Sequence, residues 1–222
     1  MKIRIITDNT VYKPEVNSKL KKEWGFSSLI ESEDFPSILF DTGASGEVLL
    51  NNIKVLGIDV QRIDCIFISH NHFDHTGGLE SFLEQNKNVR LYVPGSYPSI
   101  SEIKAKEIIR IHGLQEIYEN VYSTGELSDI EQSLIVKTNK GVVVIVGCSH
   151  PGVEKILNTV SQVGKIYALI GGLHGFNKFE ILKDLELICA THCTQHITEI
   201  QDLYPEKFVS GGAGRVIEIL TA

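Results

Sequence analysis

The stretch Ser69-His70-Asn71-His72-Phe73-Asp74-His75-Thr76-Gly77-Gly78 places three histidines and one aspartate within six residues. It follows Cys65-Ile66-Phe67-Ile68, an apolar run that predicts a buried strand. After it, Leu79, Phe82 and Leu83 have the spacing of one helical face. We therefore expect a turn at the carboxyl end of a strand, where a rigid sheet can hold several side chains around one point.

The spacing within this turn suits metal binding. In extended backbone, residues two apart project to the same side, so His70 and His72 can bind one cation. Asp74 and His75 follow on a curving backbone and can face a second cation. Imidazole nitrogen and carboxylate oxygen are ligands for zinc, iron or nickel, and two cations about 3.5–4 Å apart can share a hydroxide. The alternative is a surface turn that is histidine-rich by chance. The whole chain contains only 8 His, so chance alone would rarely place three of them within six residues.

Four histidines have the same position relative to the predicted strands. His70, His150, His174 and His192 each fall at or just past the end of an apolar run. Strand ends at one edge of a sheet lie near one another, so we expect these four side chains to converge. A single strand-end histidine would be read as a structural residue, whereas four in the same position favour a shared site.

The residues His70-x-His72-x-Asp74-His75, after an apolar strand and before Gly77-Gly78, resemble the signature of the metallo-β-lactamase superfamily. Phe40-Asp41-Thr42-Gly43 is similar to the strand-end Asp-x-Gly motif of that fold. The resemblance implies an α/β architecture, the four-layer αββα sandwich, in which two mixed sheets pack face to face with helices on both outer sides. It also implies that Asp41 orients a ligand histidine from behind.

The resemblance further implies two metal sites. His70 and His72 match ligands of a first metal. Asp74 and His75 match ligands of a second metal, which the late histidine His192 completes. The implied cofactor is two divalent metal ions, zinc in the first instance, with iron, manganese or nickel as alternatives.

Two positions depart from the superfamily's pattern. Residues 129–132 contain no histidine where the third ligand of the first metal usually stands. Gly147-Cys148 stands where a bridging aspartate is usual. His150 is our candidate to replace one of these ligands, and His174 is either a further ligand or an acid that faces the substrate. Occupancy of both metal sites therefore stays open.

Four further motifs together resemble one branch of the superfamily, the ribofuranosylaminobenzene 5′-phosphate (dihydropterin) synthase-like proteins. They are Glu131-Gln132-Ser133-Leu134, Gly147-Cys148-Ser149-His150-Pro151-Gly152, Gly171-Gly172-Leu173-His174 and Thr191-His192-Cys193-Thr194. This resemblance implies a transferase that condenses a pterin with a phosphorylated aryl riboside. Gln195 stands where these proteins usually have glycine.

Composition limits the classes of protein. The chain of 222 residues has ordinary globular usage, with 42% hydrophobic and 22% charged residues, and we expect one domain over residues 1–222. Its 28 acidic and 21 basic residues give a net charge of −7, which argues against a nucleic-acid or anionic-membrane surface. No apolar run approaches the roughly 20 residues of a membrane span. With a strand predicted from residue 2 and only 4 Cys, we expect no signal peptide, a reduced cytoplasmic setting and buried thiols.

Periodicity and turn signals predict an alternation of strands and helices. Strands are expected at 2–7, 26–31, 37–40, 63–69, 89–93, 115–123, 133–138, 142–147, 166–170, 187–190 and 215–220. Helices are expected at 48–56, 79–85, 99–106, 153–160, 179–186 and 197–203. Residues 11–25 are expected to form a loop or flap, whose Lys19, Lys21 and Lys22 meet either a substrate phosphate or solvent.

Two other motifs carry alternative interpretations. Cys189, His192, Cys193 and His196 form C-x₂-H-C-x₂-H, which could hold a structural zinc, although the spacing is tighter than in zinc fingers. Gly211-Gly212-Ala213-Gly214-Arg215 is either a phosphate cradle built from backbone amides or an ordinary tight turn.

The sequence thus favours a metal-dependent hydrolase in which a metal-bound hydroxide attacks an ester-like or phosphoester-like bond of a small, phosphorylated or acyl substrate. Asp74 and His174 are the expected catalytic residues. Two other classes stay open: the pterin-linked transferase, and a non-catalytic metal or ligand sensor on the same scaffold. Nothing in the sequence sets the oligomeric state.

Overall fold

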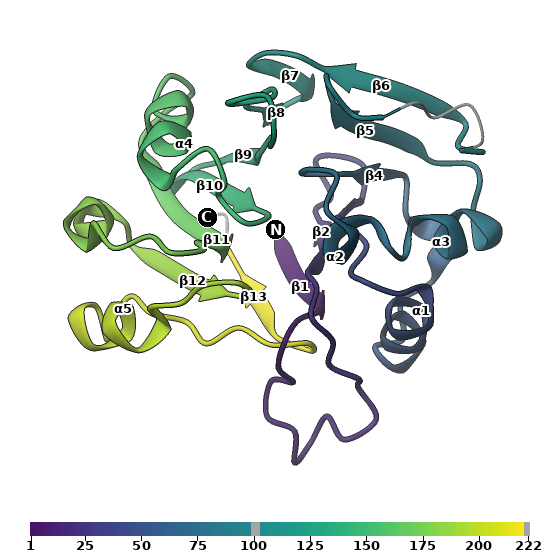
Figure 1. Ribbon diagram of the computed structural model, residues 1–222, viewed down its shortest axis with the longest axis horizontal. Helices are drawn as coiled ribbons and strands as arrows, with labels where there is room; N and C mark the ends of the chain where they lie inside the picture. The colour runs from purple at the N-terminus through teal and green to yellow at the C-terminus, as the bar shows by residue number, and fades with distance from the viewer. Residues whose placement is uncertain (99–102, 220–222) are drawn as a thin grey trace.

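Two mixed β-sheets face each other in the computed structural model, which describes residues 1–98 and 103–219 (Figure 1). Within those residues, the first sheet has seven strands in the order β13-β1-β2-β3-β4-β5-β6. The second has six strands in the order β12-β11-β10-β9-β8-β7. The amino-terminal half of the chain thus builds most of one sheet, and the last strand returns to complete it.

The first sheet combines antiparallel and parallel pairs. Strand β1 pairs antiparallel with β13 and β2, β2 pairs antiparallel with β3, and β3 to β6 continue in parallel. Its strands are β1 (Lys2–Thr7), β2 (Ser27–Glu31), β3 (Ile38–Phe40), β4 (Cys65–Phe67), β5 (Arg90–Pro94), β6 (Glu107–Ile111) and β13 (Val216–Glu218).

The second sheet is built around the hairpin that the sequence predicts. Strands β9 and β10 pair antiparallel, β8 and β7 continue antiparallel on one side, and β11 and β12 continue in parallel on the other. Its strands are β7 (Gln115–Tyr118), β8 (Val121–Ser123), β9 (Leu134–Thr138), β10 (Gly141–Val146), β11 (Ile166–Gly172) and β12 (Leu187–Thr191).

Helices cover the outer face of each sheet (Figure 1). The first sheet is covered by α1 (Gly46–Val55), α3 (Leu79–Gln85) and the 3₁₀ turn η1 (Val60–Arg62), with the short α2 (Phe73–Thr76) at its edge. The second is covered by α4 (Val153–Val160), η2 (Phe179–Asp184) and α5 (Ile197–Leu203). This confirms the four-layer αββα sandwich.

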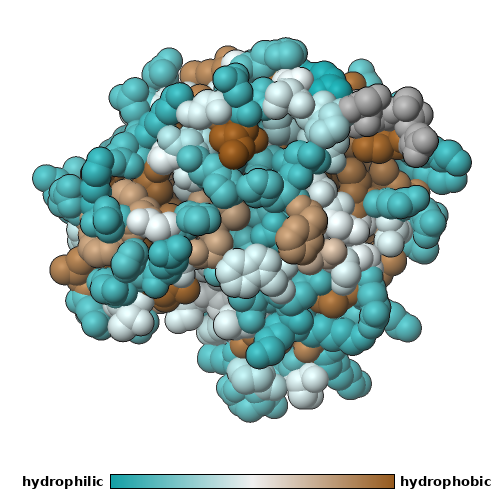
Figure 2. Space-filling model, in the orientation of Figure 1, coloured by the Kyte–Doolittle hydropathy of each residue, from teal (hydrophilic) through white to brown (hydrophobic). Residues whose placement is uncertain are grey.

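Alternation along the strands explains why so many of them are apolar at every position. In β10, Val143 and Ile145 pack between the sheets, whereas Val142, Val144 and Val146 pack against the outer helices. A strand buried on both faces needs apolar residues on both. On the face seen in Figure 2, hydrophobic residues lie in small separate patches among hydrophilic ones.

Most predicted elements are confirmed within a few residues, and three predictions need correction. Of the helix predicted at 99–106, residues 99–102 lie outside the described part of the chain, and 103–106 are not helical. Strand β6, which directly follows, was not predicted. Residues 115–123 form the hairpin β7–β8 rather than one interrupted strand, and the helix predicted at 179–186 is shorter, a 3₁₀ helix over residues 179–184. None of the described helices is long and apolar enough to cross a membrane.

Candidate metal centre

The histidine-rich turn lies at the carboxyl end of β4, as its sequence predicts. His70 is fully buried, with its Nδ1 2.9 Å from Ser69 Oγ and its Nε2 3.0 Å from His72 Nδ1. The chain then enters α2, which places Asp74 and His75 in one helical turn. His72 is the residue that precedes this helix, and it is exposed.

Asp41 lies behind this turn, at the end of β3. Its Oδ2 is 2.7 Å from His75 Nδ1 and accepts a hydrogen bond from Ser69 Oγ at 2.7 Å, and its Oδ1 accepts one from Ser69 N at 2.7 Å. Burial would lower the pKa of His75, but the Asp41 carboxylate more than offsets this and the pKa is raised. Because Asp41 occupies Nδ1, the Nε2 atom of His75 is left facing the centre of the site.

Potential metal donors from three loops, those after β4, β10 and β12, converge at this edge of the two sheets. One group, whose ligand atoms all lie within 4.8 Å of one another, contains Asp74, His75, Cys148 and His192. A second group with the same spacing contains His70, Cys148 and His150. His72 borders the second group, with its ring centroid 4.8 Å from that of His150. The structure therefore brings together His70, Asp74, His75, His150 and His192, with His72 beside them, and adds Cys148.

His192 is fixed by residues that the sequence analysis missed. It follows β12 with a backbone φ of 52°, a left-handed conformation uncommon for residues other than glycine. Its Nδ1 lies 3.0 Å from Asn9 Oδ1, and Asn9 Nδ2 donates to its carbonyl oxygen at 2.8 Å. This leaves Nε2 directed toward Asp74 Oδ2, 3.4 Å away. In the sequence, the one feature that could have marked Asn9 as a site residue is its position just after the first strand.

The glycine loop near the carboxyl terminus supports this arrangement instead of binding phosphate. Gly212 N donates to Asp8 Oδ2 at 3.0 Å, and the N–H groups of Ala213 and Gly214 donate to backbone carbonyls. Asp8 also accepts a hydrogen bond from His192 N at 3.2 Å. Of the two interpretations offered for residues 211–215, the structure supports the tight turn, because these amides are already used within the protein.

The loop after β10 is held by Glu131, which is fully buried. Its Oε1 accepts hydrogen bonds from the backbone N–H groups of Gly147, Cys148 and Ser149 at 3.1, 3.0 and 3.0 Å. Its Oε2 accepts one from His150 N at 2.8 Å. Residues 129–132, where the superfamily usually has a ligand histidine, therefore instead contain the carboxylate that orients the loop after β10.

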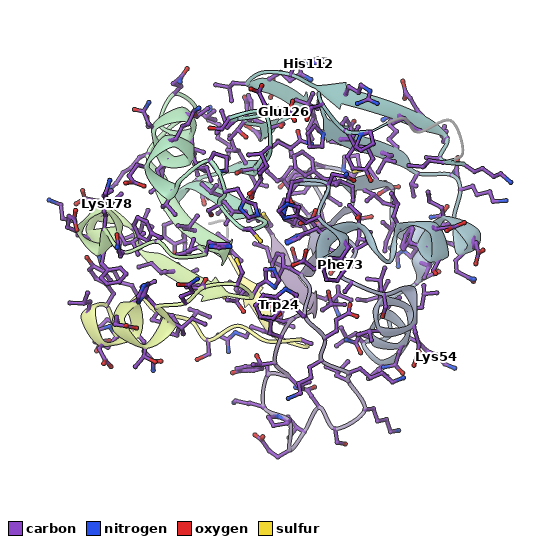
Figure 3. The ribbon with its side chains drawn as sticks, viewed as in Figure 1. Trp24, Lys54, Phe73, His112, Glu126 and Lys178 are labelled. Atoms are coloured by element: carbon purple, nitrogen blue, oxygen red, sulfur yellow. The ribbon has the colours of Figure 1, made fainter. Side chains whose placement is uncertain are left out.

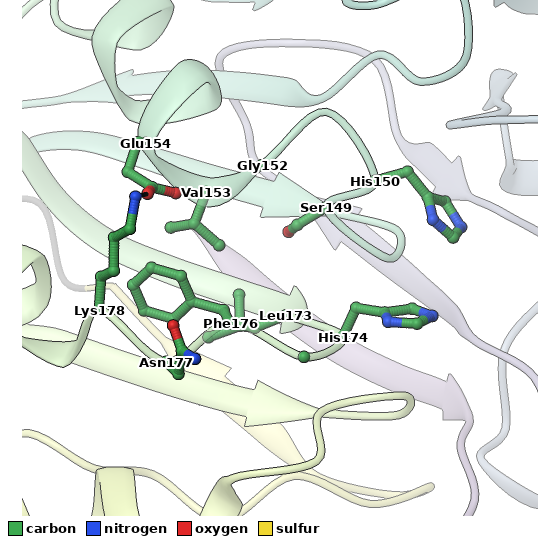
Figure 4. Close-up of a pocket in the computed structure, with 11 residues that line it drawn as sticks. Ser149, His150, Gly152, Val153, Glu154, Leu173, His174, Phe176, Asn177 and Lys178 are labelled. Carbon is green, nitrogen blue, oxygen red and sulfur yellow. Dashed lines mark ion pairs between the residues drawn. The ribbon is translucent and has the colours of Figure 1, made fainter.

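His174 follows β11 on the outer side of the site, exposed, with its ring centroid 5.3 Å from that of His150. It belongs to neither donor group. Both rings line one end of a pocket of about 220 Å³, and an ion pair between Lys178 and Glu154 at 2.6 Å closes the other end (Figure 4). His174 thus lines a pocket that adjoins the donor groups.

Burial and neighbouring groups set protonation states that suit metal binding. Burial and the nearby His75 lower the pKa of His70, and burial together with His72 lowers the pKa of His150 to about 4. Burial would raise the pKa of Asp74, but His192 and His75 lower it to about 2. At neutral pH these three groups are therefore two neutral imidazoles and a carboxylate, the forms that ligate cations.

Atomic spacing supports the same conclusion. With bonds of about 2.0–2.3 Å, two ligand atoms on one tetrahedral zinc lie about 3.3–3.8 Å apart. Within the first group, His75 Nε2 lies 3.2 Å from Cys148 Sγ and 3.7 Å from Asp74 Oδ2. The Nε2 atoms of His150 and His192 are buried without a hydrogen-bond partner. Nitrogen, oxygen and sulfur donors with these gaps fit divalent zinc or iron.

The competing structural zinc site is not assembled. Cys189 packs in the core between the sheets, and His196 Nδ1 lies 3.0 Å from Glu199 Oε1 on α5. His192 instead belongs to the group with Asp74. All four cysteines are buried, as expected, but Cys148 lies among polar ligands rather than in the apolar core.

The loop over residues 11–25 is confirmed, and it reaches the site at its end. The Trp24 ring lies 5.6 Å from that of His192, and its side chain is 59% exposed. Phe73, in the histidine turn, is 68% exposed, and both aromatic residues lie at the centre of the view in Figure 3. Lys21 points elsewhere and pairs with Glu47 at 2.6 Å.

Known proteins share both the sequence and the fold. The family model described as the metallo-beta-lactamase superfamily matches residues 25–173. A 7,8-dihydropterin-6-methyl-4-(beta-D-ribofuranosyl)-aminobenzene-5'-phosphate synthase from Methanocaldococcus jannaschii is 27% identical, over 91% of this chain and 92% of that protein. An uncharacterized protein from the same organism is 26% identical, over 98% of this chain and all of that protein.

Solved structures agree. Tm1679, described as a metal-dependent hydrolase of the beta-lactamase superfamily, superposes with a TM-score of 0.79 at 25% identity and covers 99% of both chains. Zn(2+)-bound PqqB from Methylobacterium extorquens has the same fold, with a TM-score of 0.64 at 11% identity over 99% of this chain and all of that chain. The histidine-rich turn, the two facing sheets and the match over two thirds of the sequence lead to one conclusion: this chain belongs to the metallo-β-lactamase superfamily.

Proposed function

We propose that this chain is a metal-dependent hydrolase that acts on a small ester-like or phosphorylated substrate. The observation that carries the proposal is the convergence of two donor groups at one edge of the sandwich, next to a pocket. The related structure described as a metal-dependent hydrolase, which covers 99% of this chain, supports it.

We assign the ligands as two sets. His70, His72 and His150 would hold one divalent cation, so that His150 takes the place of the histidine that residues 129–132 lack. Asp74, His75 and His192 would hold the other. Cations bound there supply Lewis acidity, which lowers the pKa of water and stabilises negative charge on a leaving oxygen.

The remaining residues orient the substrate and move protons. His174 faces the pocket, where a protonated ring nitrogen can donate a proton to the leaving oxygen. Asp74 has a depressed pKa and so stays an acceptor across the neutral range. Asp41 holds the ring of His75 in one orientation from the far side. The substrate would bind in the pocket that extends from His150 to the Lys178–Glu154 pair (Figure 4).

The test is metal content and turnover measured on the same preparations. The wild type should bind divalent metal and hydrolyse members of a panel of phosphodiesters, carboxylic esters and thioesters. His70→Ala should lose bound metal and at least about 100-fold of the rate, since even losing a residue that only supports a ligand costs about 10–100-fold. The matched control is His112→Ala, which removes an exposed histidine far from the site. Full turnover by metal-stripped protein would refute the mechanism.

A second candidate, a pterin-linked transferase, is favoured by the synthase from M. jannaschii, which aligns over nearly its whole length. The two exposed aromatic side chains, Trp24 and Phe73, also offer flat surfaces on which a fused ring could stack. Consumption of a dihydropterin substrate only when a phosphorylated aryl riboside is present would identify this activity. Metal binding without either activity would instead favour the sensor.

A further inference from the structure

Cys148 occupies a singular position in the candidate metal centre. Within the described residues, its Sγ is the one ligand atom that belongs to both donor groups. It lies 3.2 Å from His75 Nε2 on one side and within 4.8 Å of ligand atoms of His70 and His150 on the other. A single atom placed between two sets of ligands has the position of a bridge.

The backbone around Cys148 is held in place independently of any metal. Three N–H groups, those of residues 147–149, donate to one oxygen of the buried Glu131 carboxylate. Gly147 lies so close to the histidine turn that a Cβ there would collide with Ser69 Oγ and lie 3.1 Å from His70 Nδ1. Cys148 is therefore presented to the site by a fixed loop, and its side chain is 97% buried.

The neighbouring groups point to a ligand at this place. The Nε2 atom of His192, a residue only 6% exposed, has no hydrogen-bond partner and belongs to the same donor group as Cys148. Asp74 Oδ2 lies 3.4 Å from that atom and 3.7 Å from His75 Nε2. The ligand atoms of these three side chains and of the thiol lie within 4.8 Å of one another, a spacing that fits ligands of one cation.

We propose that the thiolate of Cys148 bridges the two cations, in the place where the superfamily's pattern has an aspartate. This inference rests on the proposed two-metal site. If each metal–sulfur bond is about 2.3 Å and the cations are about 3.5–4 Å apart, the metal–sulfur–metal angle is about 100–120°. A bridging sulfur can adopt such an angle. On binding, the thiol loses its proton to solvent and the sulfur lone pairs form the two metal–sulfur bonds.

A thiolate bridge changes which metals the site prefers. Sulfur is a softer ligand than carboxylate oxygen and favours zinc, iron or cobalt over manganese or magnesium. Cobalt(II) is therefore a useful probe, because cobalt bound to thiolate shows a charge-transfer absorption that cobalt bound only to nitrogen and oxygen lacks. The absorption reports the metal–sulfur bond itself, independently of any activity.

The experiment titrates metal-free full-length protein with cobalt(II) and records absorption together with bound cobalt per chain. The wild type should bind two cobalt ions and show the charge-transfer band. Cys148→Ser should lose the band and bind the second ion at least about 100-fold more weakly. Mutating a residue that only supports a ligand already lowers metal affinity by about 10–100-fold, and Cys148 is proposed to be a ligand itself. Cys148→Asp should lose the band but keep both ions. Cys193→Ser, a change to the neighbouring thiol that belongs to neither donor group, should keep the band.

Each other outcome overturns something specific. A band that persists in Cys148→Ser, or a wild type that binds two cobalt ions without a band, would refute the bridge and leave the proposed function standing. A wild type that binds no cobalt, zinc or iron would refute the proposed function as well. Circular dichroism of every variant shows whether it has folded, and Cys148→Asp serves as the folded comparison if Cys148→Ser does not fold.

Discussion

Replacing Glu131 by glutamine tests whether a buried carboxylate positions the ligand loop. Every hydrogen-bond partner of its two oxygens is a backbone N–H donor. Burial raises the pKa of Glu131, and the N–H donors act against that effect. Because no partner could accept a proton from a carboxylic acid, we infer that the side chain is ionised at neutral pH.

The size of the effect follows from the geometry. Glutamine can keep its oxygen toward the three N–H groups of residues 147–149, but its NH₂ group must then face the N–H of His150, where Glu131 Oε2 now accepts at 2.8 Å. One buried donor left unpaired costs about 1–3 kcal/mol, and the other three bonds weaken as the charge is lost, for a total of about 2–4 kcal/mol. At about 2–4 °C per kcal/mol for a chain of this size, Tm should fall by about 4–16 °C.

The assay is thermal unfolding of metal-free protein, followed by metal titration. Glu131→Gln should also bind metal about 10–100-fold more weakly, because Cys148 and His150 shift with the loop. Glu80→Gln, the same change at an exposed position on α3, is the matched control and should leave both quantities unchanged. If metal-free Glu131→Gln melts within about 1 °C of the wild type, the carboxylate is not what holds the loop.

Three other perturbations follow from the same contacts. Asp41→Asn should weaken metal binding by about 10–100-fold, because His75 loses its charged partner; competition with a coloured chelator measures this, and an unchanged affinity would contradict the role of Asp41. Removing metal with a chelator should lower stability by about 2.7 kcal/mol relative to protein in metal at 100 times Kd, and identical melting curves with and without metal would argue against a metal centre. Burial raises the pKa of both Cys65 and Cys189 from 9.0 to about 12. Both thiols should therefore resist alkylation in the native protein near about pH 8, as mass spectrometry would show. From about pH 9 the thiols ionise only in the unfolded chain, so the free energy of unfolding should fall as pH rises from about 9 toward 12.

Local patterns in the sequence were sufficient for much of the fold. The apolar runs that become β4, β10 and β11 are buried on both faces, so their signal is strong, and the histidines that follow them mark the shared edge of the sheets. Strand β6 was missed because Glu107–Ile111 lies at the end of its sheet and is only partly buried, which leaves a weak apolar pattern. The histidine turn itself was recognisable because its donors are neighbours in sequence.

The rest of the centre depends on contacts between distant residues. Asn9 orients His192 from 183 positions away, and nothing in the short segment around Asn9 distinguishes it from an ordinary turn. Cys148 is as buried as a core residue, but its thiol lies 3.2 Å from His75 Nε2, in a loop whose backbone N–H groups are hydrogen-bonded to Glu131. The sequence shows Gly147-Cys148 where the aspartate is usual, whereas the position of the Cys148 thiol between two donor groups emerges only from the folded geometry.

Three buried carboxylates share one task at this edge of the sandwich. Asp41, Glu131 and Asp8 are each at most 1% exposed, and each accepts backbone N–H groups from a different loop that carries ligands. Buried anions are costly unless they are fully hydrogen-bonded, and even then their mutual repulsion remains. Two divalent cations would bring four positive charges beside these three carboxylates and the carboxylate of Asp74. The anions that shape the loops therefore also favour cations at the centre, so the arrangement that costs stability in the metal-free protein is the one that strengthens metal binding.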